Sequence, residues 1–387
     1  MQPAEFRATT SLALVFSVRL LGLFMVYPVF AAYAGGLAGA NPYLIGEALG
    51  IYGLTQGLLQ IPFGLLSDKF GRKPMIAAGL LLFVIGSSVA AMSTSVAGLI
   101  FGRALQGAGA VGSVILAMLA DLTSEGSRTK AMAVVGITIG GSFLVALVVG
   151  PIVSSFVGVP GLFWLMAVLG IVGIGIVLLV VPTPSCLEVH GDAETVPRVF
   201  GAVLRNRALL RLDLGIFALH AILTAMFLIV PGLLRATLQV TADSDWKIYL
   251  PVLLASVVVM GAVVGFERRQ RGQGIFIGAI AALAASNALM MFGGGSATLL
   301  IAALVVFFSA FNILEASLPS LVSKTAPAEA KGTALGVYSS LQFLGIFAGG
   351  AAGGWINQHA GNSGVFAFTI ALALLWLITA VTLHPRG

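Results

Sequence analysis

Long apolar runs separated by short polar breaks dominate the chain, and their lengths predict helices that cross a bilayer. A helix needs roughly 20 apolar residues to cross a hydrocarbon core about 30 Å thick, and no run alternates as a transmembrane β-strand would. We therefore predict an all-α integral membrane protein with two pseudo-symmetric bundles. The twelve predicted spans are 10–34, 44–66, 75–93, 96–120, 129–155, 160–181, 208–234, 247–266, 274–293, 297–322, 332–356 and 364–383.

The one long polar break divides these spans into two groups of six. We predict a first bundle at 1–182, a solvated cytoplasmic linker at 183–206 and a second bundle at 207–387. A shift of 203 residues without gaps superposes Pro28 on Pro231 and Ser93 on Ser296 and aligns the span boundaries. Parallel repeats of this kind place a binding site between the halves, which is reached alternately from each side by rocking.

Composition agrees with a membrane protein that carries no catalytic centre. Of the 387 residues, 59% are hydrophobic and only 9% are charged, against about a quarter charged in soluble domains. The single cysteine, Cys186, excludes an internal disulfide. No phosphate loop, metal-ligand spacing or nucleophile–base set is present, so we expect no cofactor, no metal and no enzyme.

Basic loop residues set the predicted orientation. If the N-terminus is cytoplasmic, nearly all of them lie on the cytoplasmic side, and only Arg235 and Lys247 lie opposite. We therefore predict a bacterial inner membrane protein with both termini inside. The net charge of +6 then reflects topology rather than nucleic-acid binding.

The loop between the second and third spans holds an unusual cluster of charges. It contains Gly64, Asp68, Gly71, Arg72 and Lys73. We predict that Asp68 faces the partially positive start of the eleventh span near Gly332, while Arg72 binds Asp68 and Asp121 steadies the arginine. These residues would form a latch between the halves. The general excess of basic residues in cytoplasmic loops would explain Lys69 and Lys73, but it would not explain the acidic Asp68 between Gly64 and Gly71.

These motifs resemble those of the major facilitator superfamily. Gly64-x-x-x-Asp68-x-x-Gly71-Arg72-Lys73 resembles its motif A, and Arg103-Ala-Leu-Gln106-Gly107 resembles motif B. Leu21-Gly22 with Pro28 resembles the first-helix motif of twelve-span drug:proton antiporters. Gly150-Pro151 matches motif C on the fifth helix only in part, because Ala146, Ser154 and Ser155 replace its other residues.

Within that superfamily, "IYGLTQGLLQIPFGLLSDKFGRKP" and "KGTALGVYSSLQFLG" are similar to YajR-type bacterial transporters. The resemblance implies that helices 1, 4, 7 and 10 line a central cavity. Relatives of that type usually carry a soluble domain after the last helix, which we expect to be missing here.

Ionisable residues at membrane depth are the candidates for proton coupling. Glu315 lies inside the tenth span and His220 midway along the seventh, so the resemblance places both at the cavity. A carboxylate at low dielectric gains affinity for protons and a nearby imidazolium opposes this, so the pair can exchange a proton. The alternative is a buried pair that only holds the two helices together.

Two arginines are candidates in the first half. Arg103 and Gln106 share one helix face, and the resemblance associates the motif B arginine with proton coupling and cavity organisation. Arg19 could bind an anionic group of the substrate. Alternatively, either arginine caps loose carbonyls or pairs with a distant acid. The predicted cavity residues are Arg19, Tyr27, Gln56, Gln106, Asn312, Tyr338 and Gln342, although helix–helix hydrogen bonding would explain such polar residues equally well.

These observations predict a proton-coupled secondary transporter, an exporter that exchanges a small solute or drug for protons. Its expected partners are the solute, protons and the lipid bilayer, and we expect a monomer. Proton-coupled uptake of a sugar or organic anion and a non-transporting membrane sensor remain alternatives. A membrane enzyme would need catalytic acids or metal ligands grouped at one depth, and a channel would need a shared axis.

Overall fold

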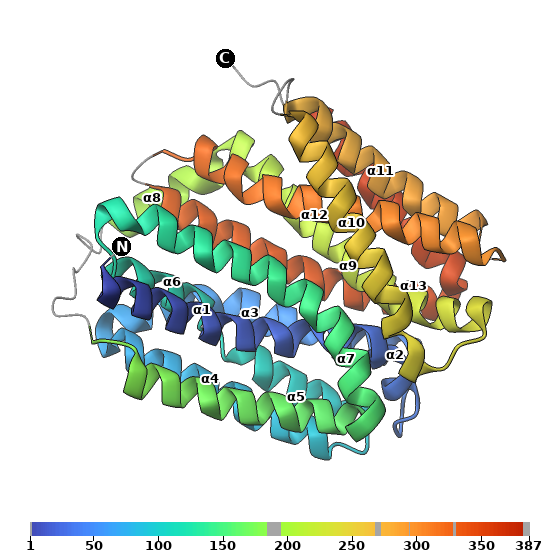
Figure 1. The fold of residues 1–387 in the computed structure, drawn as a ribbon, viewed down its shortest axis with the longest axis horizontal. Coiled ribbons are helices and arrows are strands. Elements are labelled where there is room, and N and C mark those ends of the chain that lie inside the picture. The colour runs from blue at the N-terminus through green and yellow to red at the C-terminus, as the bar shows by residue number, and fades with distance from the viewer. Residues whose placement is uncertain (1, 184–194, 268–271, 294, 328–329, 382–387) are drawn as a thin grey trace. The chain divides into compact units, whose positions relative to one another are not determined.

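The computed structural model describes residues 2–183, 195–267, 272–293, 295–327 and 330–381, and nearly all of them are helical (Figure 1). The elements are α1 (Pro3–Phe24), α2 (Tyr27–Gly35), α3 (Pro42–Phe70), α4 (Arg72–Met92), α5 (Val96–Ala108), α6 (Gly112–Asp121), α7 (Glu125–Gly175), η1 (Ile176–Val180), α8 (Thr195–Arg205), α9 (Arg207–Leu238), η2 (Ala242–Ser244), α10 (Trp246–Glu267), α11 (Gly272–Phe292), α12 (Ala297–Thr325) and α13 (Lys331–Val381).

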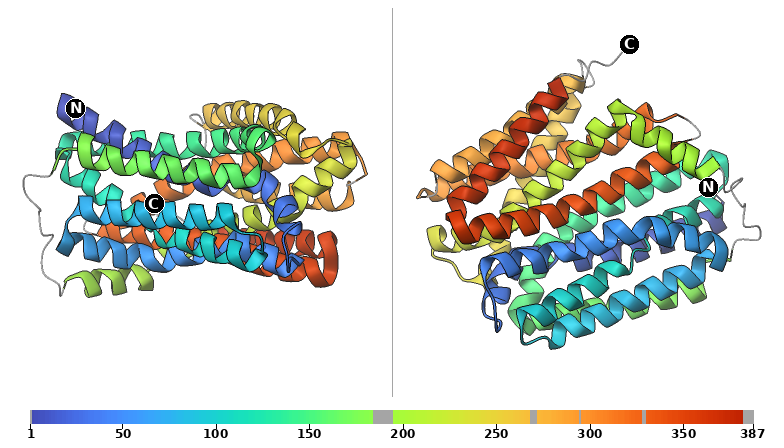
Figure 2. Two further views of the ribbon diagram at one scale, coloured as in Figure 1. Left: turned by 90° about the horizontal axis from the view of Figure 1, so that it is seen from below. Right: turned by 180° about the vertical axis from the view of Figure 1, so that it is seen from behind.

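Ten helices of the described chain are long and apolar enough to cross a membrane. Two of them, α7 and α13, contain a break at a glycine with positive φ, Gly158 at 70° and Gly361 at 64°. Each therefore supplies two of the predicted spans, and the ribbon turns sharply near the red end of the chain (Figure 2). The two glycines are related by the predicted shift of 203 residues. The all-α membrane fold is confirmed.

Two predicted spans are not continuous helices. The span predicted at 10–34 is interrupted at Met25–Val26, between α1 and α2. The span predicted at 96–120 is interrupted at 109–111, between α5 and α6. Hydropathy averages over such short breaks because the residues in them are as apolar as their neighbours.

The described chain divides by its internal contacts into two units. The first comprises Met1–Ala40 and Ile51–Gly191, and the second comprises Asn41–Gly50 and Asp192–Gly387. The domain boundaries predicted from the sequence remain a prediction, although residues 41–50 group here with the second unit. Of the linker predicted at 183–206, residues 184–194 lie outside the described residues, and 195–205 form α8.

Apolar packing holds the first unit together around α1, α4, α6 and α7. Its core contains Leu12 and Val15 of α1, Leu80 of α4 and Met118 of α6, all fully buried. Other large apolar side chains face outward, such as Phe156, which is 82% exposed. Such exposure is favourable only where the surroundings are as apolar as the side chain, so these surfaces suit a lipid environment.

In the second unit, α9 packs closely along α13. A Cβ atom at Gly345 or Gly349 of α13 would overlap the carbonyl oxygens of Phe217 or Ala221 on α9. Glycine at these positions lets the two backbones approach, as small residues do between membrane helices. This approach brings the polar side chains of α13 next to those of α9.

Candidate functional site

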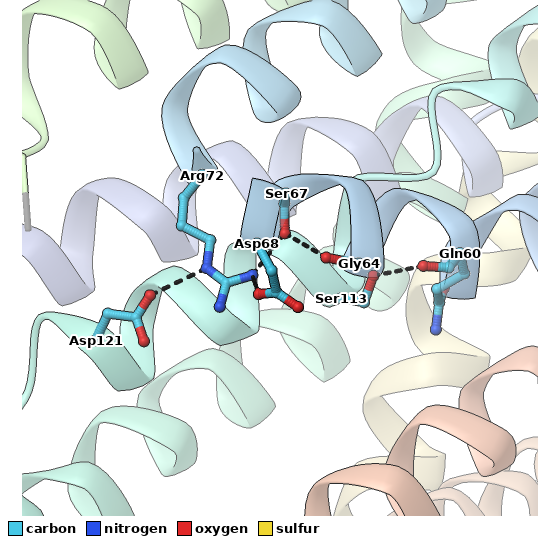
Figure 3. A network of polar contacts seen from close by, with 7 residues as sticks. All are labelled: Gln60, Gly64, Ser67, Asp68, Arg72, Ser113 and Asp121. Carbon is cyan, nitrogen blue, oxygen red and sulfur yellow. Dashed lines mark hydrogen bonds and ion pairs between the residues drawn. The ribbon is translucent and has the colours of Figure 1, made fainter. Parts of the chain in front are cut away.

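The predicted charge cluster between α3 and α4 forms a connected network within the first unit (Figure 3). The Arg72 guanidinium lies 2.5 Å from Asp68 Oδ1 through Nη1 and donates to Asp121 Oδ2 through Nε at 3.0 Å. Arg72 Nη1 also donates to Ser67 Oγ at 2.6 Å, and Ser67 donates to the Gly64 carbonyl. The structure thus brings together the arginine and both acids that the sequence singled out.

Burial differs sharply within this cluster. The side chains of Arg72 and Asp121 are 8% and 5% exposed, whereas Asp68 is 56% exposed. Gly71 directly precedes α4 and has a φ of 91°, a conformation that other residues adopt only at a cost. Lys73 lies in the first turn of α4 with its side chain half-buried. The neighbour predicted for Asp68, near Gly332, belongs to the second unit, so the latch stays a prediction.

A histidine, a glutamine and a glutamate meet within the second unit, and we call this group the His–Gln–Glu site. The Gln342 amide nitrogen lies 2.9 Å from His220 Nε2 and donates to Glu315 Oε1 at 3.1 Å. His220 Nε2 is 3.8 Å from Glu315 Oε2. Three helices, α9, α12 and α13, therefore meet at one polar point, which unites the two predicted proton-coupling residues of this unit.

Burial and packing fix this site. His220 is 1% exposed, and its Nδ1 lies 3.3 Å from the Ile216 carbonyl one turn earlier. The Phe311 ring packs edge-on against the imidazole with centroids 5.8 Å apart. Glu315 is 27% exposed, and its Oε2 has no hydrogen-bond donor in the described part of the chain. The glutamate is therefore the more accessible member.

The other polar residues predicted on these helices lie in different surroundings. Asn312 donates to Ser256 Oγ of α10 at 3.2 Å, so it joins two helices rather than entering the site. Tyr338 is buried, and its hydroxyl has no partner among the described residues. Asp213 is 1% exposed, and its Oδ1 is also unpartnered in the described structure.

Two buried arginines of the first unit gather around Tyr52, and we call this group the two-arginine site. Arg19 of α1 donates through Nη2 to Tyr52 Oη at 3.2 Å and also to Gln56 Oε1. The Arg103 guanidinium of α5 lies 4.9 Å from the centre of the Tyr52 ring. Arg19 is 4% exposed and Arg103 is 0% exposed. The predicted cavity residues Arg19 and Gln56 are thus in direct contact.

Glutamines and a serine continue this site. Arg103 Nη1 donates to Gln106 Oε1 at 2.8 Å, and Gln106 Nε2 donates to Ser87 Oγ of α4 at 2.7 Å. Gln56 in turn donates to Gln60 Oε1 at 3.3 Å. Tyr27 is fully buried. These glutamines orient the guanidinium groups but cannot neutralise them.

The partial motif on the fifth predicted span has a structural role in the first unit. A Cβ atom at Gly150 of α7 would overlap the Met25 carbonyl. Met25 lies in the break between α1 and α2, so Gly150 allows α7 to approach that break. Pro151 follows it inside α7 and is buried.

Two serines that the sequence interpretation did not single out complete these networks. Ser67 accepts from Arg72, and Ser87 accepts from Gln106. Ser67 directly precedes Asp68, which was a usable signal. Ser87 offered none, because a serine on an apolar helix commonly donates to its own backbone, as Ser87 itself does to the Phe83 carbonyl and Ser88 to that of Val84.

Two bundles of membrane-spanning helices with ionisable groups buried inside each define a secondary transporter. A family model described as Major Facilitator Superfamily matches residues 12–350, and the chain belongs to that family. It is therefore a multi-pass membrane transporter and not an enzyme.

Relatives and solved structures support this assignment. The chain is 44% identical over 387 residues to the "Inner membrane transport protein YajR" of Escherichia coli, covering 99% of this chain and 84% of the relative. The human organic anion transporter MFSD10 has a similar fold, with a TM-score of 0.72 and 21% identity over 98% of this chain and all of that one. The nucleoside transporter NupG gives a TM-score of 0.77 at 14% identity, over 97% of this chain and 99% of that one.

Proposed function

We propose that this transporter couples the movement of a small solute to protons, and that the His–Gln–Glu site is where the proton binds. The carrying observation is the contact of one amide nitrogen with both His220 Nε2 and Glu315 Oε1, at 2.9 and 3.1 Å. Ionisable groups within a membrane are costly and mark ion or substrate pathways by default. A site of one base and one acid is suited to take up and release a proton.

The protonation state that we propose follows from one assignment of the donors in these hydrogen bonds. If Gln342 donates to His220 Nε2, that nitrogen carries no proton and the imidazole is neutral, with Nδ1–H donating to the Ile216 carbonyl. A proton arriving at Nε2 would face the amide hydrogens of Gln342. The amide must then rotate to present its oxygen, which changes the contact between α9 and α13.

We propose that this rearrangement links protonation to alternating access. In the proposed cycle Glu315 takes a proton from outside, helped by His220, releases it inward and drives export of the solute. The Asp68–Arg72–Asp121 latch stabilises the outward-open state, and Arg103 assists coupling from the first unit. The similarity to the inner membrane transport protein of E. coli supports an inner-membrane location, and the basic loop residues support cytoplasmic termini.

Proton movement in liposomes that contain the purified protein tests this proposal. A pH-sensitive dye reports flux on addition of cationic drugs, sugars and organic anions. We expect at least one class to drive flux in the wild type, and Glu315→Gln to abolish that flux. Glu47→Gln is the matched control, because Glu47 accepts a hydrogen bond from Tyr43 away from the site, and it should behave as wild type.

Three results would contradict the proposal. Undiminished flux in Glu315→Gln would place the proton site elsewhere. Accumulation of a solute without proton movement would favour transport that is not proton-coupled, and the absence of both would favour a sensor.

A further inference from the structure

The two-arginine site contains positive charge that the chain itself does not neutralise. Among the described residues, no carboxylate lies within ion-pair distance of Arg19 or Arg103. Arg19 Nε, Arg103 Nε and Arg103 Nη2 are buried without any hydrogen-bond partner in the described structure. Because an unpaired buried charge is expensive, such groups call for a counter-ion.

Three acids of the first unit are engaged with other partners. Glu5 accepts from the Ser124 amide, and Asp68 and Asp121 are engaged with Arg72. Glu5 lies in the first turn of α1, Asp68 in the last turn of α3, and Asp121 is the last residue of α6. Between Glu5 and Glu47, and again between Asp68 and Asp121, the sequence contains no acidic residue. The deep part of this unit is purely basic.

The break between α5 and α6 adds to the positive field. A Cβ atom at Gly112, the first residue of α6, would lie 3.6 Å from Arg19 Nη1. No side chain caps this helix start, and the amides at a helix start carry partial positive charge. Broken membrane helices present such starts to anionic groups of substrates. The helix start and the unpartnered guanidinium nitrogens thus favour the same kind of ligand.

The apolar walls of the site indicate the rest of the ligand. Arg103 lies over the ring of Tyr52 and 6.0 Å from the centre of the Phe30 ring. Tyr27, Tyr52 and Phe30 are all fully or almost fully buried. A ligand that reaches the guanidinium groups would therefore pack its body against aromatic rings.

We propose that the two-arginine site binds the carboxylate of the transported solute, which is an organic acid with an apolar body. The free edges of Arg19 and Arg103 donate charge-assisted hydrogen bonds to the carboxylate, and the aromatic rings pack against the body. This inference rests on the proposed transport function, because the buried site must open as the two units alternate. It assigns substrate recognition to the first unit and proton binding to the second.

Binding to the purified full chain in detergent at neutral pH tests the inference without a proton gradient. The probes share one body and differ in the head group: phenylbutanoate, phenylbutanamide and phenylbutylammonium. A series of acids from acetate to decanoate varies the body. We expect at least one carboxylate to bind and to raise the melting temperature, with its amide and ammonium analogues at least about tenfold weaker.

Variants then assign the binding to the arginines. Arg19→Gln should weaken carboxylate binding about ten- to a hundredfold, and Arg19→Lys should retain part of it. Arg207→Gln, an exposed arginine at the start of α9, should bind as wild type. The comparison of head groups needs no variant, so it stands even if Arg19→Gln fails to fold.

The inference is overturned if no acid binds more tightly than its amide, or if Arg19→Gln binds the carboxylate as wild type does. These outcomes are independent of proton flux. If carboxylates bind but no proton flux is seen, the proposed proton coupling fails and the proposed carboxylate site stands. If only cations or sugars drive proton flux, the carboxylate site fails and the proton coupling stands.

Discussion

The polar sites of the two units occupy related places in the internal repeat and carry opposite charge. A shift of 203 residues relates Gly112 to Glu315 and Ser17 to His220. Where the second unit has a glutamate inside the continuous helix α12, the first has a glycine at the start of α6, beside Arg19. In the first unit, Ser17 makes a 2.6 Å hydrogen bond with Ser142 of α7. Equivalent positions of the two halves still align at a constant shift, but the side chains at these positions differ in their chemistry.

The difference between the sites lies in how each satisfies its charge. In the His–Gln–Glu site, an acid and a base are joined through Gln342, so the site can change its own net charge by gaining or losing a proton. In the two-arginine site, glutamines orient the guanidinium groups and leave their charge uncompensated. A group that stays protonated suits anion binding, whereas a titratable pair suits proton exchange.

Adding an acidic side chain to the two-arginine site should have the largest effect of all, because it neutralises the charge that distinguishes this site from the His–Gln–Glu site. Gln56→Glu is nearly isosteric and places a carboxylate on Arg19, which already donates to the Gln56 side chain. The internal counter-ion should weaken binding of external carboxylates by about a hundredfold and raise the melting temperature. Titration of the variant with the best-binding acid measures the first effect, and a thermal melt measures the second.

Gln60→Glu provides a nearby comparison, because Gln60 accepts a hydrogen bond from Gln56, which itself accepts from Arg19. It should weaken the same binding less. If both variants weaken binding equally, the long-range repulsion by the added negative charge determines binding, and direct contact of the carboxylate with Arg19 does not.

Paired glycines in the two units test whether the repeat packs equally tightly in both. Gly150→Ala should lower the free energy of unfolding by about 1–3 kcal/mol, because its Cβ atom would overlap the Met25 carbonyl. Gly353, its counterpart in the repeat, leaves 3.1 Å to the nearest side-chain atom, the Ala225 Cβ, so Gly353→Ala should cost less. Unfolding in denaturant measures both, and the reverse order would contradict the packing seen here.

The sequence predicts most of the helices and most residues of the two sites, but it does not predict which side chains contact one another. The kinks at Gly158 and Gly361 fall between predicted spans, because glycine and hydropathy breaks coincide there. The interruptions before Tyr27 and Gly112 were missed because their residues are apolar. Gln342 was a predicted cavity residue, but its bridging position depends on the close approach of α9 and α13, which no local pattern encodes.

Removing the hydrogen bonds of Gln342 in the second unit should reduce function less than adding an acidic side chain to the two-arginine site. Gln342→Leu keeps the size of the side chain and deletes the contacts to His220 and Glu315. We expect solute-driven proton flux to fall about tenfold, as for loss of one positioning contact, and its pH profile to change. Carboxylate binding to the two-arginine site should be unaffected. A rate loss without a changed pH profile would indicate a purely structural role for Gln342.

The smallest expected effect on stability comes from substitution of Asp68, the exposed acid near the turn between α3 and α4. Asp68 is 56% exposed, whereas Asp121 is 5% exposed against the same arginine. Asp68→Asn should therefore change the free energy of unfolding by less than about 1 kcal/mol, since solvent screens exposed pairs, while Asp121→Asn should cost more. If Asp68 also forms the proposed latch, its variant should transport abnormally in spite of near-normal stability. Unfolding and flux measured on the same preparations separate these roles. A stability loss for Asp68→Asn as large as that for Asp121→Asn would show that Asp68 acts as a structural ion pair, and normal flux would remove the latch.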